Sequence, residues 1–249
     1  MNDQLTDKVA IVTGAGSGIG RAIALRFAQA GVRVVATDID DSSGQETVRL
    51  IQEQQGVSSY KHSDVAQSDE VQAMVQHTLD TYGRLDFAIN NAGIPDKGPR
   101  PLAEYEEGEW NHVITVNLTG IFLCMKYEIP AILQREAGVI VNIASIGAYR
   151  AGLGFPAYTA SKAAVLNLTQ TAAAEYGPTG LRVNAIVPGQ IETPALEKLI
   201  EVHMAWMKNR CAKWAYNASR YGGMVSQRRL PMLHCGYVLP SLRLSMATI

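Results

Sequence analysis

Short apolar runs alternate along the chain with longer segments whose apolar positions recur at helical spacing. Residues 18–30 and 68–81 show the helical period, and Gly31 and Gly83 follow them, where a left-handed helix cap is favoured. Such alternation predicts a single α/β domain with a doubly wound parallel sheet, covered by helices on both faces. The runs predicted to be strands are residues 9–12, 32–37, 57–62, 85–90, 139–144 and 182–187.

The glycine-rich stretch TGAGSGIG, residues 13–20, joins the first predicted strand to the first predicted helix. Gly14, Gly18 and Gly20 permit a tight turn, a close approach of the backbone to a pyrophosphate and close packing of the helix on its strand. The N–H groups at the start of the helix favour a negative charge. Taken alone, the motif is equally compatible with a glycine-rich turn that binds nothing. Its place between a strand and a helix favours a dinucleotide.

Asp38 ends the second predicted strand, eighteen residues after Gly20. A carboxylate at this point can accept hydrogen bonds from both hydroxyls of an adenosine ribose and repels a 2′-phosphate, which favours NAD over NADP. Two alternatives stay open. Asp38 can instead cap a helix or turn in the sequence DIDDS, and Arg21 and Arg33 can attract the extra phosphate of NADP.

Tyr158 and Lys162 are four residues apart in a helix-forming run, residues 157–175, so both project from one face. An adjacent ammonium favours the phenolate form of a tyrosine, and Tyr158 is therefore the predicted general acid/base. Ser145 follows a strand at the carboxyl edge of the sheet, where ligands bind, and can donate a hydrogen bond to a substrate oxygen. The structural alternatives are a surface Tyr–Lys pair and a serine that caps a helix.

Six motifs follow one another along the chain: TGxxxGxG at 13–20, NNAG at 90–93, Asn117, Ser145, YxxxK at 158–162 and PG at 188–189. In their order and spacing the chain resembles the short-chain dehydrogenase/reductase family, from about residue 6 to about residue 196. The resemblance implies a Rossmann fold, NAD(P)(H) as cofactor, and hydride transfer between an alcohol and a ketone. It also implies that Lys162 holds the nicotinamide ribose and that Asn117 supports a water-mediated proton relay.

The resemblance assigns the cofactor contacts as well. Two of them have an alternative: Asp64 and Val65, placed at the adenine, also suit a simple turn, since Asp is a favoured turn residue. Asn117 can likewise satisfy helix backbone groups. The adjacent amides of NNAG are costly after a strand unless they bond something. The implied contacts are Gly14, Ser17, Gly18, Ile19, Gly20, Asp38, Asp64, Val65, Asn90, Ala92, Gly93, Tyr158, Lys162, Pro188, Gly189, Ile191 and Thr193.

The composition changes after about residue 200. The last 48 residues carry 7 of the 22 Lys and Arg residues, and none of the 23 acidic residues lies beyond Glu201. The substrate lid, helix motif and final strand that the resemblance implies are missing there. We therefore predict a nucleotide-binding catalytic domain at residues 1–200 and an atypical C-terminal segment at residues 201–249.

A frameshift accounts for that segment. Possible coding DNA that is read from the third base of each codon gives Asp at Trp206-Met207 and Gly at Met224-Val225, and from Met224 onward permits the missing helix motif of the family. The alternative is a divergent basic tail that binds an acidic partner. The altered segment weighs against the tetramer that the family resemblance implies, and a dimer or tetramer stays the expectation.

Composition limits the function further. The chain has 249 residues, 47% of them hydrophobic and 18% charged, which is enough for one sizeable core. No segment reaches the roughly 20 apolar residues of a membrane span, and the opening residues lack a signal-peptide pattern, so we expect a cytoplasmic protein without a membrane partner. A net charge of −1 gives no reason to propose a nucleic acid.

Cysteine and histidine predict neither disulfides nor a metal, because Cys124, Cys211 and Cys235 are an odd, unpatterned set and the five histidines have no ligand spacing. The expected function is an NAD-dependent alcohol dehydrogenase or ketone reductase acting on a small apolar or cyclic substrate. The alternative is a nucleotide-binding protein without turnover, which needs no proton donor.

Overall fold

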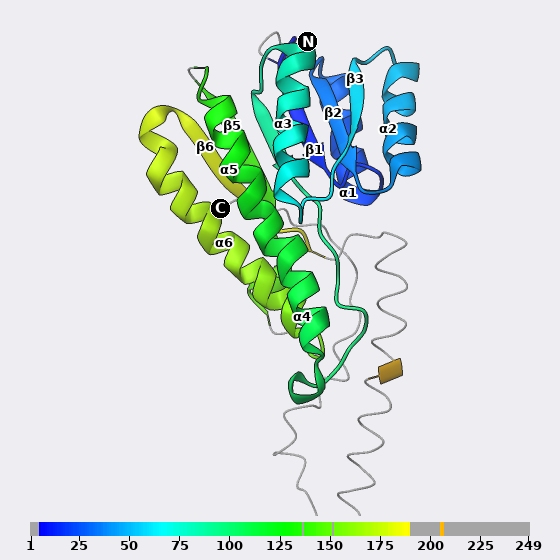
Figure 1. Ribbon diagram of the computed structural model, residues 1–249, viewed down its shortest axis with the longest axis vertical. Coiled ribbons are helices and arrows are strands. Elements are labelled where there is room, and N and C mark those ends of the chain that lie inside the picture. The colour runs from blue at the N-terminus through cyan, green and yellow to red at the C-terminus, as the bar shows by residue number, and fades with distance from the viewer. Residues whose placement is uncertain (1–4, 136, 151, 190–204, 207–249) are drawn as a thin grey trace, which may run out of the picture. The chain divides into compact units, whose positions relative to one another are not determined.

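Six parallel strands form one sheet in the order β3-β2-β1-β4-β5-β6 (Figure 1). The computed structural model describes residues 5–135, 137–150, 152–189 and 205–206, and the sheet belongs to a compact unit that ends at Pro188. The strand order reverses between β1 and β4, so the predicted doubly wound parallel sheet is confirmed. The strands are β1 Val9–Thr13, β2 Arg33–Asp38, β3 Ser58–His62, β4 Phe87–Asn90, β5 Gly138–Ile143 and β6 Leu181–Ile186.

Helices connect the strands and cover both faces of the sheet. The predicted left-handed cap at Gly83 is confirmed, because this residue ends α3 with a φ of 71°. Asp40, which the sequence did not single out, caps α2 by accepting from the N–H groups of Ser42 and Ser43. The helices are α1 Gly18–Gln29, α2 Asp41–Glu53, α3 Ser68–Tyr82, α4 Glu107–Ile114, α5 Gly120–Ile132 and α6 Pro156–Tyr176.

The sheet separates two apolar cores. Ile11 and Val12 are neighbours on β1 and therefore point to opposite faces. Ile11 lies in the core that includes residues of α3, α5 and α6, and Val12 lies in the core that includes residues of α1 and α2. Because both faces are covered, β1 is buried along its whole length. No helix in the described residues is long and apolar enough to cross a membrane.

The predicted atypical C-terminal segment lies almost wholly outside the described residues. Of residues 201–249 the structure describes only residues 205 and 206. The boundary at residue 200 and the frameshift therefore stay predictions.

A chain of buried polar side chains crosses the core beside α5. Glu128 is fully buried, and its Oε2 accepts from Nδ2 of Asn90 at 2.9 Å. The same Asn90 nitrogen donates to Oδ1 of Asn142 at 3.0 Å, and Nδ2 of Asn142 donates to Oγ1 of Thr169 at 2.9 Å. These bonds join β4, β5, α5 and α6. Burial raises the pKa of Glu128 to about 7, so its carboxyl is largely protonated below neutral pH.

Glu128→Gln should remove a pH dependence of stability. The folded-state pKa of about 7 lies above the ordinary value of 4.5, so the folded chain holds this proton more tightly than the unfolded chain. The free energy of unfolding of the wild type should therefore fall as the pH rises from 4.5 to about 7, by at most about 3 kcal/mol. Glutamine cannot ionise. Denaturant unfolding of wild type and Glu128→Gln, repeated between pH 4.5 and pH 7, measures this difference in pH dependence. If the stability of both proteins changed equally with pH, the raised pKa of Glu128 would be contradicted.

Candidate active site

The glycine-rich stretch forms the tight turn between β1 and α1. Gly14 and Gly18 have φ angles of 62° and 51°, a region that side chains rarely adopt. A Cβ added to Gly20 would lie 2.1 Å from the carbonyl oxygen of Gly14, so the third glycine is required by close packing of the helix on the turn. The predicted roles of the glycines as turn and packing residues are confirmed.

Side chains from outside the turn bind its carbonyl groups. Nδ2 of Asn91 donates to the carbonyls of Thr13 and Gly14 at 3.0 and 3.1 Å. Both amides of the NNAG sequence thus bond groups of the protein, Asn91 at this turn and Asn90 in the core, where the side chain of Asn90 points away from the cofactor position that the resemblance implies. The hydroxyl of Thr47 on α2 donates to the carbonyl of Ala15 at 2.8 Å.

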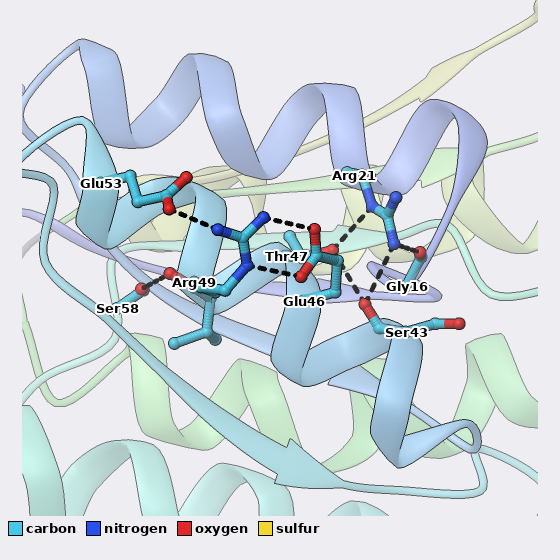
Figure 2. Close-up of polar contacts among 9 residues, drawn as sticks. Gly16, Arg21, Ser43, Glu46, Thr47, Arg49, Glu53 and Ser58 are labelled. Carbon is cyan, nitrogen blue, oxygen red and sulfur yellow. Dashed lines mark hydrogen bonds and ion pairs between the residues drawn. The ribbon is translucent and has the colours of Figure 1, made fainter.

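Arg21 on α1 also binds the turn and connects it to α2 (Figure 2). Its guanidinium donates to the carbonyl of Gly16, to the carbonyl of Ser43 at 3.1 Å and to Oγ1 of Thr47 at 2.9 Å. The second arginine considered for NADP, Arg33, pairs with Asp7. Both arginines are therefore engaged by groups of the protein itself, a use that their positions in the sequence do not reveal.

The start of α1 suits a phosphate group. The first N–H groups of a helix have no acceptor within the helix, and the side chain of Ser17 makes no capping bond. Ser17 and Gly18 are exposed, and the first turn carries no acidic residue. This arrangement, with glycines where a Cβ would obstruct, fits the pyrophosphate of a dinucleotide.

Asp38 lies at the end of β2, directly beside the turn. Its Oδ2 accepts from the N–H of Gly16 at 2.8 Å, and its Oδ1 accepts from the N–H of Asp40 at 3.1 Å. The helix-cap alternative for Asp38 is wrong, because Asp40 caps α2. The turn alternative is confirmed, because the carboxylate accepts from an N–H two residues further on. The carboxylate therefore occupies the position next to the glycine turn that the sequence assigned to ribose binding.

Lys162 and Tyr158 lie on α6 at the carboxyl edge of β5. Nζ of Lys162 donates to the carbonyl of Ile143 at 2.9 Å and lies 5.8 Å from the centroid of the Tyr158 ring. Burial lowers the pKa of Lys162 to about 8, since the charged form loses its hydration. Because Lys162 is only 4% exposed, the alternative of a surface Tyr–Lys pair is wrong.

Ser145 faces the same space as Tyr158. A Cβ added to Gly147 would lie 3.5 Å from Oγ of Ser145 and 3.6 Å from Cε1 of Tyr158. The Ser145 hydroxyl and the Tyr158 ring are therefore both close to the same position beside Gly147. Oγ of Ser145 accepts from the N–H of Gly147 at 3.1 Å, at the start of the short helix Ile146–Ala148. The cap alternative for Ser145 is therefore also true, and it leaves the hydroxyl proton free for a substrate oxygen.

Asn117 lies beside the Lys162 ammonium. It belongs to a π-helical turn, Thr115–Thr119, between α4 and α5, a feature frequent at functional sites. Its Oδ1 accepts from the N–H of Ile94 at 2.8 Å and its Nδ2 donates to the Ile94 carbonyl at 2.9 Å. A Cβ on Gly93 would lie 3.2 Å from Oδ1 of Asn117 and 3.3 Å from Nζ of Lys162.

The remaining predicted residues lie in several environments. The carboxylate of Asp64 accepts from the N–H of Ala66 at 2.9 Å, as in the turn alternative. Val65 is buried, and so is the side chain of Asn90, which points into the polar chain beside α5. The carbonyl of Pro188 accepts from the N–H of Ile146 at 2.9 Å.

Three further predicted residues lie at or after the end of the described range 152–189. Among the described residues, nothing lies within 4 Å of a Cβ added to Gly189, and Ile191 and Thr193 lie outside the described ranges.

Known proteins are similar to this chain over most of its length. The model of the short chain dehydrogenase family matches residues 8–203. A 2,5-dichloro-2,5-cyclohexadiene-1,4-diol dehydrogenase of Sphingobium indicum is 43% identical over 201 residues, which is 79% of this chain and 78% of that protein. Cyclohexanol dehydrogenase of an Acinetobacter species is 40% identical over 204 residues, 82% and 81% of the two chains.

A solved structure is similar to this chain in fold as well. The crystal structure of levodione reductase superimposes with a TM-score of 0.75 and 34% sequence identity, covering 78% of this chain and 75% of that one.

Proposed function

The chain belongs to the short-chain dehydrogenase family, and we propose that it interconverts a small cyclic alcohol and the corresponding ketone with NAD(H). Its relatives are named dehydrogenases, so the chain is an oxidoreductase of the alcohol dehydrogenase and ketone reductase class that uses a nicotinamide cofactor, NAD or NADP. The observation that carries the proposal is the buried ammonium of Lys162 beside Tyr158, across from Ser145.

Each residue of this group has a role in proton transfer. The hydroxyl of Ser145 donates a hydrogen bond to the substrate oxygen, because the bond that Oγ accepts from the N–H of Gly147 leaves the hydroxyl proton available. Tyr158 takes the proton of the alcohol in oxidation and returns it to the ketone oxygen in reduction. The bound nicotinamide supplies the chemistry at carbon, by accepting or donating a hydride.

Lys162 stabilises the negative charge of the phenolate. Its pKa of about 8 keeps the side chain largely charged at neutral pH, and burial strengthens the attraction between opposite charges. Asn117, fixed by both backbone groups of Ile94, lies next to the ammonium and supports the proposed proton relay to solvent.

NAD is the proposed cofactor because of the charges around the turn after β1. The carboxylate of Asp38 repels a 2′-phosphate, and Arg21 and Arg33 are bound to other groups of the protein. The proposed residues for the dinucleotide are those of the glycine turn, with Asp38 at the adenosine ribose. A cyclic substrate is proposed because two of the relatives are named for cyclic alcohols.

The alternative of a nucleotide-binding protein without turnover receives no support from the relatives, which are named for their reactions. A pure binder also needs no buried ammonium beside a tyrosine. Cytoplasmic location and a homo-oligomeric state stay predictions from the sequence.

Tyr158→Phe should abolish most turnover. The substitution removes only the transferable proton, so kcat with cyclohexanol and NAD should fall by roughly 10²–10⁴-fold, while the dissociation constant for NADH stays unchanged. Tyr176→Phe, near the other end of α6, is the matched control and should retain the wild-type rate. Steady-state kinetics and NADH fluorescence measure the two quantities. A Tyr158→Phe enzyme as fast as wild type would remove Tyr158 from the mechanism.

Asp38→Ala should relax the choice of cofactor. Without the carboxylate, repulsion of the 2′-phosphate disappears, and the ratio of kcat/KM for NAD to that for NADP should fall about tenfold or more. Asp41→Ala is the control, since Asp41 also lies near the end of β2 but bonds Tyr60 and His62. An unchanged ratio in Asp38→Ala, or an equal change in the control, would count against the ribose role.

A further inference from the structure

The N-terminus of α6 receives its cap from a distant part of the chain. The side chain of the N-cap residue, Phe155, contains no acceptor, and the first helical residue, Pro156, has no N–H. The N–H of Tyr158 donates instead to Oδ2 of Asp96 at 3.1 Å, although these residues are 62 positions apart. No acidic residue lies in the first turn of α6, so Asp96 also supplies the negative charge that a helix N-terminus favours.

Asp96 is itself fixed by residues that follow β4. It is 1% exposed, and its Oδ1 accepts from the hydroxyl of Tyr105. Burial and the neighbouring carboxylates raise the pKa of Tyr105, so this hydroxyl keeps its proton and acts as a donor. Glu109 completes the arrangement by accepting from the N–H of Lys97 at 2.6 Å and pairing with Arg100 at 3.2 Å.

A second contact joins residues 96–105 to the loop before α6. The N–H of Arg100 donates to the carbonyl of Gly154 at 3.0 Å. Gly154 has a φ of 85°, and a Cβ there would lie 2.6 Å from Cβ of Pro99. Residues 96–105 are therefore bound to the start of α6 at two points, and one of them is the backbone of Tyr158 itself.

We propose that Asp96 is a positioning residue, whose carboxylate fixes the first turn of α6 and thereby the place of the Tyr158 phenol. The inference rests on the proposed function, in which Tyr158 transfers the proton. Tyr158 is the third residue of α6 and lies in its terminal turn, whereas Lys162 lies one turn further on and is fixed by the Ile143 carbonyl. The cap therefore controls the phenol and leaves the ammonium in place.

Hydrogen exchange of the Tyr158 amide tests the cap without any substrate. Asp96→Ala removes the acceptor, and exchange at this amide should rise about tenfold, whereas Asp96→Asn keeps a capping oxygen and should stay close to wild type. Exchange in the later turns of α6 should not change. The matched control is Asp86→Ala, because Asp86 is also buried and accepts a backbone N–H, that of Val9 at 2.9 Å, at the opposite edge of the sheet.

Kinetics of the full-length chain test the consequence for Tyr158. With cyclohexanol and NAD, kcat of Asp96→Ala should fall about tenfold or more, as for the loss of a helix cap at a catalytic turn, and Asp96→Asn should recover most of it. The dissociation constant for NADH should stay within about twofold, because the glycine turn is untouched. Asp86→Ala should lower the stability of the fold and leave kcat and the Tyr158 amide unchanged.

Unchanged exchange at Tyr158 in Asp96→Ala would overturn the cap, and so would an equal rise in Asp86→Ala. The positioning role would be overturned if kcat of Asp96→Asn were no higher than that of Asp96→Ala, or if kcat of Asp96→Ala were unchanged. If Asp96→Ala does not fold, Tyr105→Phe decides, since it deletes only the hydroxyl on Oδ1: faster exchange at Tyr158 supports the inference and unchanged exchange rejects it. Turnover unaffected by Tyr158→Phe, with exchange still raised in Asp96→Ala, would reject the proposed function alone.

Discussion

The burial of one ammonium group arranges most of this active site. Lys162 has little access to water, and its charge is tolerated because Nζ donates to the Ile143 carbonyl and lies near the Tyr158 ring. The space around the charge is narrow beside Gly93, where an added Cβ would lie 3.2 Å from Oδ1 of Asn117 and 3.3 Å from Nζ of Lys162, so that both neighbours would have to shift. A positive charge in such surroundings favours a phenolate more strongly than the same charge on a surface helix.

The parallel sheet brings the other groups to this charge. Because all six strands run in one direction, their carboxyl ends lie at one edge. The glycine turn follows β1, NNAG begins at the last residue of β4, Ser145 follows β5 and Pro188 follows β6. Side chains then lock these loops to one another, as Asn91 does for the glycine turn. Beneath them the buried chain through Glu128 and Asn142 joins β4, β5, α5 and α6, the elements that carry or adjoin the catalytic residues.

The sequence predicted those parts of the molecule that local patterns encode. Short strand-like runs located all six strands, although β3, with the sequence SSYKH, is mostly polar, and Gly83 ended α3 as its conformational freedom suggests. Contacts between distant positions were not predictable, because nothing near Asp96 in the sequence indicates a helix 62 residues away. The π-helical turn at Asn117 and the burial of Glu128 depend on packing between elements, which a single sequence does not show. The bonds of Arg21 to carbonyl groups, which weigh against the NADP alternative, were not predictable for the same reason.

The central claim, that the Lys162 ammonium makes Tyr158 an effective base, is tested most directly by the initial rate of NADH formation from cyclohexanol and saturating NAD. Wild-type protein and Lys162→Met are compared, because methionine fills similar space without a charge. We expect measurable turnover by wild type and a rate lower by about 100-fold or more in Lys162→Met, as for loss of an electrostatic contact in a catalytic site. Equal rates for the two proteins would contradict the account.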